Sequence, residues 1–234
     1  MSNPHQPSAR AAPTTGLLAA LPEELGPWIE GQPLQRQGLT FYQSAADSPG
    51  TVPGQGPAVL ACVGGVGKVR AAKAATLLVE LGIQRLFVVG TCGGLRRHLG
   101  PGEMVHCERA AQTDYGLRDG REVQPDLELL EAWRALVPGR LGWFLTADRA
   151  VMSTWRKIRL ARAFSGDCVA EMETAAAALV AHEAGVPWAA LRAVTDRAGH
   201  MTPASFRQNF PIQAGRAANT VSALIERLSG AVRG

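Results

Sequence analysis

The chain has 234 residues, of which 46% are hydrophobic and 19% charged, and its formal net charge is +4. This balance is typical of a globular domain and argues against a disordered chain, a coiled coil or a collagen. The longest apolar runs are far shorter than the ~18 residues of a membrane-spanning helix. The basic residues are scattered, which argues against a nucleic-acid-binding surface.

Residues 1–15 are rich in Pro, Ser, Ala and Thr and contain no apolar segment typical of a signal peptide. We expect a disordered tail there and a single domain over residues 16–234. The cysteines are widely spaced, at positions 62, 92, 107 and 168. Because a chain of this size does not need disulfides, this usage favours reduced thiols and a cytoplasmic protein.

The predicted elements alternate between strands and helices along the chain. Strands are expected at residues 16–21, 39–43, 58–63, 86–89, 104–107, 141–146 and 188–194, with the strand at 39–43 exposed. Residues 47–57 are rich in Gly and Pro and indicate a hairpin loop. Helices are expected at residues 68–81, 126–136, 154–164, 171–184 and 202–228, the last with Pro211 as a candidate kink. This order predicts one α/β domain with a central mixed, twisted sheet flanked by helices.

Polar side chains follow several of the predicted strands. In open α/β sheets ligands bind beyond the carboxyl ends of the strands. The polar residues at such positions are Glu24, Thr91, Asp148 and Asp196, with Glu171 and Glu173 at the start of a predicted helix. They come from distant parts of the sequence, as expected for a site that the fold assembles.

Three motifs each allow a functional and a structural interpretation. The glycine-rich turn at 90–94 holds ligand oxygens with its N–H groups, or is selected only for its backbone angles. The carboxylates of Glu171 and Glu173 accept hydrogen bonds from a sugar diol, or compensate a helix dipole. Arg192 lies in an apolar strand four residues before Asp196, and the two form part of a site or a structural ion pair.

Six segments, taken in order, resemble motifs of the nucleoside phosphorylase/nucleosidase superfamily. They are Ala-Leu-Pro-Glu-Glu at 20–24, Gly-Val-Gly-Lys-Val at 65–69, Gly-Thr-Cys-Gly-Gly-Leu at 90–95, Gly-Glu-Met-Val at 102–105, Glu-Met-Glu at 171–173 and Arg-Ala-Val-Thr-Asp at 192–196. The pattern is most similar to the 5′-methylthioadenosine/S-adenosylhomocysteine nucleosidase family and extends over residues 17–228. The resemblance implies a nucleoside phosphorylase-like fold.

The resemblance also implies a reaction, the cleavage of a purine nucleoside to free base and a ribose derivative through an oxocarbenium-like ribose. Asp196 matches the general acid that protonates the purine at N7, Glu24 the carboxylate that activates water, and Arg192 the cation that orients the carboxylates. The implied substrate-binding residues are Thr91, Cys92, Gly93, Val151, Glu171, Met172, Glu173, Thr195 and Phe206. No cofactor and no metal are implied. The implied partners are a small purine nucleoside and a second copy of the chain, a homodimer in which the partner closes the pocket around the 5′ group.

Two positions bear on the choice of substrates. Phosphate binding calls for arginines, and Val88 and Glu24 stand where related phosphorylases carry them, so we expect water as the nucleophile. Ala150 stands where the nucleosidase family has a phenylalanine that stacks on adenine, and Phe144 or Trp155 are candidate replacements for that ring.

Two alternatives remain open. One is a phosphorylase or hydrolase of another modified purine nucleoside, of the futalosine or adenosylhopane type, which the altered base pocket favours. The other is a nucleoside-binding protein that has lost catalysis, against which the complete set of Glu24, Glu173 and Asp196 argues.

Overall fold

The computed structural model describes residues 14–30, 33–44, 58–116, 122–199 and 202–230. The hairpin loop expected at 47–57 and most of the expected tail lie outside these ranges. Thr15, which was assigned to the tail, instead begins the first strand. The Thr15 side chain is buried and its hydroxyl accepts a hydrogen bond from Arg85 Nε at 2.7 Å.

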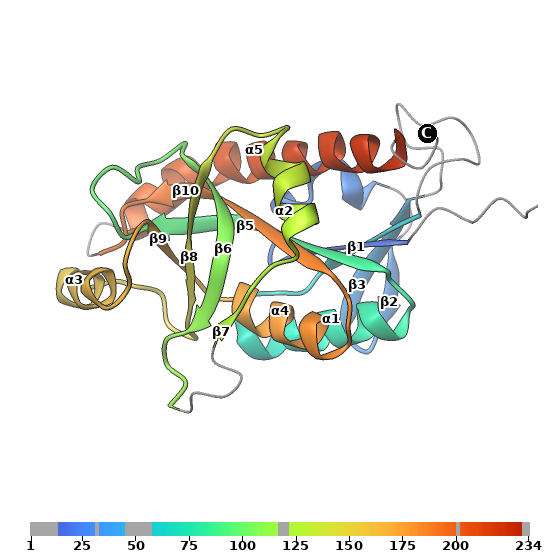
Figure 1. Ribbon diagram of the computed structural model, residues 1–234, viewed down its shortest axis with the longest axis horizontal. Helices are drawn as coiled ribbons and strands as arrows, with labels where there is room; N and C mark the ends of the chain where they lie inside the picture. Colours follow the sequence, from blue (N-terminus) through green and yellow to red (C-terminus); the bar gives the residue numbers. More distant parts are fainter. Residues whose placement is uncertain (1–13, 31–32, 45–57, 117–121, 200–201, 231–234) are drawn as a thin grey trace, which may run out of the picture.

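Strands and helices alternate as expected (Figure 1). The strands are β1 (Thr15–Ala19), β2 (Leu34–Arg36), β3 (Leu39–Ser44), β4 (Val59–Val63), β5 (Arg85–Gly94), β6 (Met104–Gln112), β7 (Glu122–Val123), β8 (Arg140–Thr146), β9 (Cys168–Glu171) and β10 (Trp188–Asp196). The helices are η1 (Pro22–Glu24), η2 (Gly26–Ile29), α1 (Lys68–Glu80), α2 (Leu127–Arg134), α3 (Thr154–Ala163), α4 (Thr174–Glu183) and α5 (Thr202–Gly230), with Pro211 inside α5.

Strand β5 is the centre of the mixed sheet. Parallel strand β1 pairs with its first part, parallel strand β10 pairs with it from Leu86 to Gly93, and antiparallel β9 pairs with its end at Gly93 and Gly94. Strands β10, β6, β8 and β9 continue from β5 and return to it, so that these five strands close on themselves. Strand β1 leaves β5 at Val88. The edge of β5 between Val88 and Gly93 is therefore open to side chains on that side, and the site lies there.

Helices cover both faces of the sheet (Figure 1). Helix α5 lies along one face, where its buried residues Ala217, Val221 and Leu224 pack with those of the strands. Helices α1 and α4 lie side by side on the opposite face and contribute many alanines to a second core. Small side chains let these two helices approach closely. The predicted single α/β domain with a mixed sheet flanked by helices is confirmed.

Two local predictions were wrong. The strand expected to be exposed at 39–43 buries Leu39 and Phe41, because β3 pairs with β4 and turns every second side chain toward the α1 core. The segment at 90–94 is not a turn, since β5 continues through it.

The glycines of β5 are explained by close packing. A Cβ at Gly90 would overlap the guanidinium of Arg192 and lie 2.9 Å from Glu24 Oε1. A Cβ at Gly94 would overlap the carbonyl oxygen of Leu99. Glycine therefore makes room for other groups at these positions, and Gly90 in particular lets two charged side chains reach the strand backbone.

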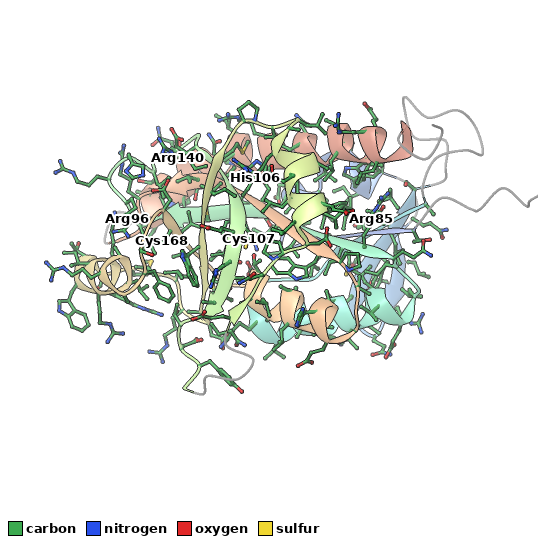
Figure 2. The ribbon with its side chains drawn as sticks, viewed as in Figure 1. Arg85, Arg96, His106, Cys107, Arg140 and Cys168 are labelled. Carbon is green, nitrogen blue, oxygen red and sulfur yellow. The ribbon has the colours of Figure 1, made fainter. Side chains whose placement is uncertain are left out.

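All four cysteines are free and buried, in line with the expected reduced thiols. Cys107 lies on β6 and Cys168 begins β9 (Figure 2). Within the described ranges, no helix combines the length and apolar character needed to span a membrane.

Candidate active site

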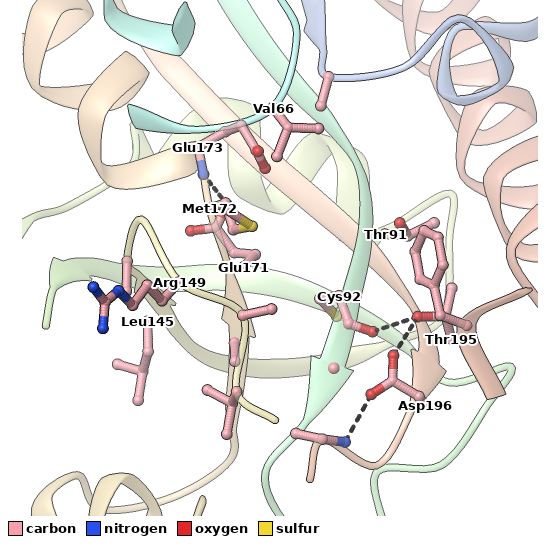
Figure 3. Close-up of a pocket in the computed structure, with 18 of the residues that line it drawn as sticks. Val66, Thr91, Cys92, Leu145, Arg149, Glu171, Met172, Glu173, Thr195 and Asp196 are labelled. Carbon is pink, nitrogen blue, oxygen red and sulfur yellow. Dashed lines mark hydrogen bonds between the residues drawn. The ribbon is translucent and has the colours of Figure 1, made fainter. Parts of the chain in front are cut away.

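A cavity opens beyond the carboxyl ends of β1, β5 and β10, where the sequence analysis expected a site (Figure 3). Eleven of the twelve predicted site residues line it, and the twelfth, Arg192, lies behind its wall with 1% of its surface exposed. The lining also includes residues that sequence reasoning did not select: Ala20, Leu21, Val66, Thr113, Leu145, Ala147, Arg149, Leu160, Ala170 and Ala198.

Glu24 ends the short helix η1 and is held by four hydrogen bonds. Its Oε2 accepts from the N–H groups of Ala20 at 3.2 Å and Leu21 at 3.1 Å. Its Oε1 accepts from the N–H of Thr91 at 2.8 Å and from the Thr91 hydroxyl at 2.9 Å. Burial raises the pKa of Glu24, while Arg192 and the Thr91 hydroxyl act in the opposite direction. Glu24 is thus a fixed carboxylate with an enhanced affinity for protons.

Arg192 is the cation around which the carboxylates gather. Its Nη2 donates to Glu171 Oε2 at 2.8 Å, to Glu173 Oε2 at 3.3 Å and to Thr174 Oγ1 at 3.1 Å. A buried guanidinium is tolerated only with such partners. The structure confirms that Arg192 is paired, but its ion-pair partners are the two glutamates rather than Asp196.

Glu171 has a structural role in the site. The predicted helix at 171–184 begins only at Thr174, and Glu171 ends β9. Its Oε2 accepts from the N–H groups of Glu173 at 3.0 Å and Thr174 at 2.7 Å, from the Thr174 hydroxyl at 2.7 Å and from Arg192. Its Oε1 accepts from the Thr146 hydroxyl. With both oxygens engaged by protein donors, the Glu171 carboxylate positions Arg192 and the start of α4.

Glu173 accepts fewer hydrogen bonds than Glu171, one at each carboxylate oxygen, and so keeps acceptor capacity for a ligand. Its Oε1 accepts from the Gly67 N–H at 3.0 Å, so that the glycine-rich loop before α1 also positions the site. Burial raises the pKa of Glu173 to about 7; Arg192 opposes this and Glu171 adds to it. Met172 lines the cavity beside it (Figure 3).

Asp196 lies across the cavity from Leu145 and Arg149, with Cys92 between them (Figure 3). Its Oδ1 accepts from the Ala198 N–H at 2.8 Å, and its Oδ2 lies 2.8 Å from the Thr195 hydroxyl. The end of β10 is irregular at Thr195, because the register with β5 shifts between Val194 and Asp196. Such a bulge re-aims side chains, and here both Thr195 and Asp196 line the cavity.

A bridge of three charged residues, which sequence reasoning missed, joins the loops at the rim. Lys68 Nζ contacts Asp114 Oδ1 at 2.7 Å and Asp148 Oδ2 at 3.6 Å. The Lys68 N–H donates to Asp148 Oδ1, and the Asp148 N–H donates to Asp114 Oδ2. The bridge ties Gly67, the donor to Glu173, to the loop after β8. Asp148 had been noted only as a polar residue at a strand end.

Neither of the rings considered as replacements for the one missing at Ala150 reaches the cavity. Phe144 is fully buried in the core and Trp155 is 68% exposed, and neither lines the cavity. The aromatic residue in the lining is Phe206 of α5, whose ring stacks on Phe210 at a centroid distance of 4.8 Å.

The described part of the chain contains no cluster of His, Cys, Asp and Glu side chains that could hold a metal ion. Three carboxylates that can exchange protons with a ligand, those of Glu24, Glu173 and Asp196, line the same cavity. Enzymes that break glycosidic bonds commonly use two carboxyl groups, one that accepts a proton and one that donates a proton.

Comparisons with known proteins agree with this geometry. The family model described as "Phosphorylase superfamily" matches residues 14–228. A 5′-methylthioadenosine/S-adenosylhomocysteine nucleosidase from Shewanella halifaxensis is 30% identical, covering 91% of this chain and 99% of that protein. An aminodeoxyfutalosine nucleosidase from Campylobacter jejuni is 29% identical, with 70% and 78% covered. The crystal structure of the S-adenosylhomocysteine nucleosidase from Streptococcus pyogenes has a TM-score of 0.84 at 26% identity, with 94% and 99% covered.

Proposed function

The chain belongs to the phosphorylase superfamily, and from this premise we propose that it hydrolyses the N-glycosidic bond of a 5′-substituted purine nucleoside. The similar proteins are named nucleosidases, and the chain is an N-glycosidase of this kind. Substrates of the 5′-methylthioadenosine or S-adenosylhomocysteine type are the first choice. The products are the free purine and the corresponding ribose derivative.

The nucleophile is a water molecule activated by Glu24. As C1′ of the ribose becomes cationic, water forms the new C1′–O bond and Glu24 takes up its proton. The raised pKa of the buried Glu24 carboxyl makes it a stronger base near neutral pH. Thr91 holds the carboxylate in place through its N–H and its hydroxyl.

The leaving purine receives a proton from Asp196 at N7, so that the C1′–N9 bond breaks with release of a neutral base. Glu173 accepts hydrogen bonds from the ribose hydroxyls and Met172 packs against the apolar side of the sugar. The negative charges of Glu24 and Glu173 stabilise the positive ribose of the transition state. The observation that carries the proposal is the presence of Glu24, Glu173 and Asp196 in the lining of one cavity.

The charge of the residues around the cavity favours water rather than phosphate as the nucleophile. Val88 is 1% exposed in the core and does not line the cavity. The position nearest the attacking group is occupied by the Glu24 carboxylate, which repels an anion. Among the residues that line the cavity, Arg149 is the basic one.

The experiment is an assay of adenine release from 5′-methylthioadenosine in phosphate-free buffer and in 50 mM phosphate, with the sugar product identified by mass spectrometry. We expect the same rate in both buffers and free methylthioribose as product. A sugar 1-phosphate would show phosphorolysis. Binding measured by calorimetry without any base release would favour the catalytically inactive binding protein.

A second candidate substrate is another modified purine nucleoside, of the futalosine or adenosylhopane type. Ala150 favours it, because the missing ring leaves the base end of the cavity unlike that of an adenine-stacking site. The similarity to an aminodeoxyfutalosine nucleosidase supports it as well. A panel of such nucleosides in the same assay ranks the candidates by kcat/KM.

We expect a homodimer, and the cytoplasmic location also stays a prediction. Exposed apolar side chains support the dimer: Val66 lines the cavity and is 46% exposed, and Val69, in the first turn of α1, is 80% exposed. Tyr115, 38% exposed, directly follows Asp114, which contacts Lys68. Light scattering on the wild type and on Val69→Glu tests this, with a monomeric wild type of full activity as the contradicting result.

A further inference from the structure

The segment that follows Asp196 leaves β10 in a tightly held conformation. Ala198 has a φ of +43°, which is uncommon for a residue with a side chain and persists only where neighbouring groups enforce it. The Gly199 N–H donates to the Val151 carbonyl oxygen at 2.8 Å. Ala198 packs against the core cluster that includes Val151 and Leu160 of α3. The segment is therefore fixed against α3 and the loop before it.

One peptide group of this segment connects Asp196 to α3. It joins Arg197 to Ala198 and is trans. Its N–H donates to Asp196 Oδ1 at 2.8 Å, drawn as a dashed line in Figure 3. Its carbonyl oxygen accepts a hydrogen bond from Lys157 Nζ. Because the peptide group is planar and rigid, Lys157 acts on the Asp196 carboxyl group through a single stiff unit.

Lys157 brings a positive charge to this peptide group. The side chain is half-buried on α3. Burial lowers the pKa of Lys157, and so does the Arg197 guanidinium, while the Asp196 carboxylate acts in the opposite direction. The Arg197 side chain is itself engaged elsewhere, because its Nε donates to the Arg97 carbonyl oxygen at 3.2 Å. The ammonium group of Lys157 is thus attracted to Asp196 and bonded to the peptide group that holds it.

The chemistry of the proposed reaction gives this contact a purpose. The Asp196 carboxyl group transfers its proton to N7 as the C1′–N9 bond breaks, the bonding electrons pass to the purine, and a carboxylate remains. An N–H binds a carboxylate more strongly than a neutral carboxyl group. A cation on the carbonyl oxygen strengthens the N–H of the same peptide group as a donor. The bond from Ala198 therefore tightens as the proton leaves, which stabilises the transition state rather than the bound substrate.

We propose that Lys157 is a positioning residue for the general acid. Its ammonium group fixes and polarises the Arg197–Ala198 peptide group, whose N–H holds Asp196 Oδ1 and keeps the carboxyl group directed at the leaving purine. This inference rests on the proposed function, because that function makes Asp196 the proton donor. Lys157 should accordingly affect kcat rather than KM, and only for leaving groups that need a proton.

Three variants of α3 test this role in adenine release from 5′-methylthioadenosine. Lys157→Met removes the charge and should lower kcat about 10- to 100-fold, as expected for a hydrogen bond that involves a charged group, with KM within about threefold. Lys157→Arg keeps a charged donor and should retain most of the wild-type kcat. Arg162→Met removes an exposed arginine from the same helix and, as the control, should leave kcat unchanged. A wild-type kcat in Lys157→Met would overturn the proposal.

Two comparisons separate positioning of the acid from a general loss of structure. In an Asp196→Asn background no proton is transferred, so Lys157→Met should change the residual kcat by less than about twofold. The 4-nitrophenyl glycoside of 5-methylthioribose has a leaving group that departs as an anion, so Lys157→Met should cleave it at nearly the wild-type rate. A fall as large as that for 5′-methylthioadenosine in either comparison would contradict the proposal. Thermal melts confirm that each variant is folded.

Failure of the proposed function gives a different result. A wild type that releases no base from any nucleoside of the panel rejects that function, and hydrogen exchange of the Ala198 amide, followed by NMR, then tests the contact alone. Lys157→Met should speed this exchange by about tenfold or more, whereas Lys157→Arg should not. Equal exchange in the wild type and Lys157→Met rejects the positioning role of Lys157.

Discussion

The Glu173→Gln variant should be more stable than the wild type at pH 8 although it loses activity. The folded-state pKa of about 7 lies above the ordinary value of 4.5. The folded protein therefore holds a proton that the unfolded chain has released, and stability falls as pH rises from 4.5 to 7. That interval corresponds to about 3 kcal/mol at ~1.4 kcal/mol per pKa unit. Glutamine avoids this cost but loses the bond from Arg192, worth about 1 kcal/mol.

We expect a net gain of about 2 kcal/mol in the free energy of unfolding at pH 8, which vanishes near pH 5 because the wild-type carboxyl is then protonated. Urea titrations of wild type and variant at pH 5, 6, 7 and 8 measure this difference. Glu23→Gln, on an exposed neighbour of Glu24, is the control and should show no such trend. A variant that is less stable at pH 8, or a difference that does not change with pH, would refute the reasoning about Glu173.

Three further predictions concern other parts of the site. Asp196→Asn keeps the shape of the side chain but cannot deliver a proton, so turnover should fall about 10²–10⁴-fold. The dissociation constant of the substrate, measured by calorimetry, should change little. Near-normal turnover in this variant would show that Asp196 has only a structural role. Gly90→Ala forces Arg192 away from the strand. We expect loss of activity and a free energy of unfolding lower by roughly 2 kcal/mol or more. A variant that melts like the wild type would contradict this. Lys68→Met removes the bridge to Asp114, and in steady-state kinetics KM should rise more than kcat falls. The free energy of unfolding, measured by urea titration, should fall by only about 1 kcal/mol because the pair is partly exposed.

The fold could be predicted well where the sequence shows a strong local pattern. The Ala- and Leu-rich segment of α1, followed by Gly82, and the start of β5 were placed to within a residue. The end of β5 was predicted too early, because the strand continues to Gly94. Predictions of exposure were weaker, since the burial of Phe41 depends on the strand and helix that happen to pack there. The glycines at 90 and 94 were assigned to a turn because the reason for each glycine is a packing contact that local sequence does not show, with the distant Arg192 for Gly90 and with the Leu99 carbonyl for Gly94.

The candidate site could also be predicted only in part, because contacts between distant residues decide the role of each side chain. Residues carried over from family motifs lie together at one cavity, but the distinction between Glu171 and Glu173 could not be predicted. Both are carboxylates two positions apart, and only the three-dimensional partners separate a saturated Glu171 from an available Glu173. The bridge made by Lys68 was missed for a similar reason, since its partners come from two later loops.

The long sequence separations within the site have a consequence for folding. The bond from Thr91 to Glu24 spans 67 residues and that from Gly67 to Glu173 spans 106. The first needs β1 beside β5, and the second needs α1 beside α4. The complete site therefore forms only after slow non-local pairing. A truncated or partly folded chain therefore lacks this cavity, rather than having a cavity of weaker affinity. A tight ligand therefore stabilises the entire domain against unfolding, in proportion to the logarithm of its concentration. The rise in melting temperature on adding a ligand consequently reports on the whole domain, and the amplitude of that transition reports how much of a preparation has folded.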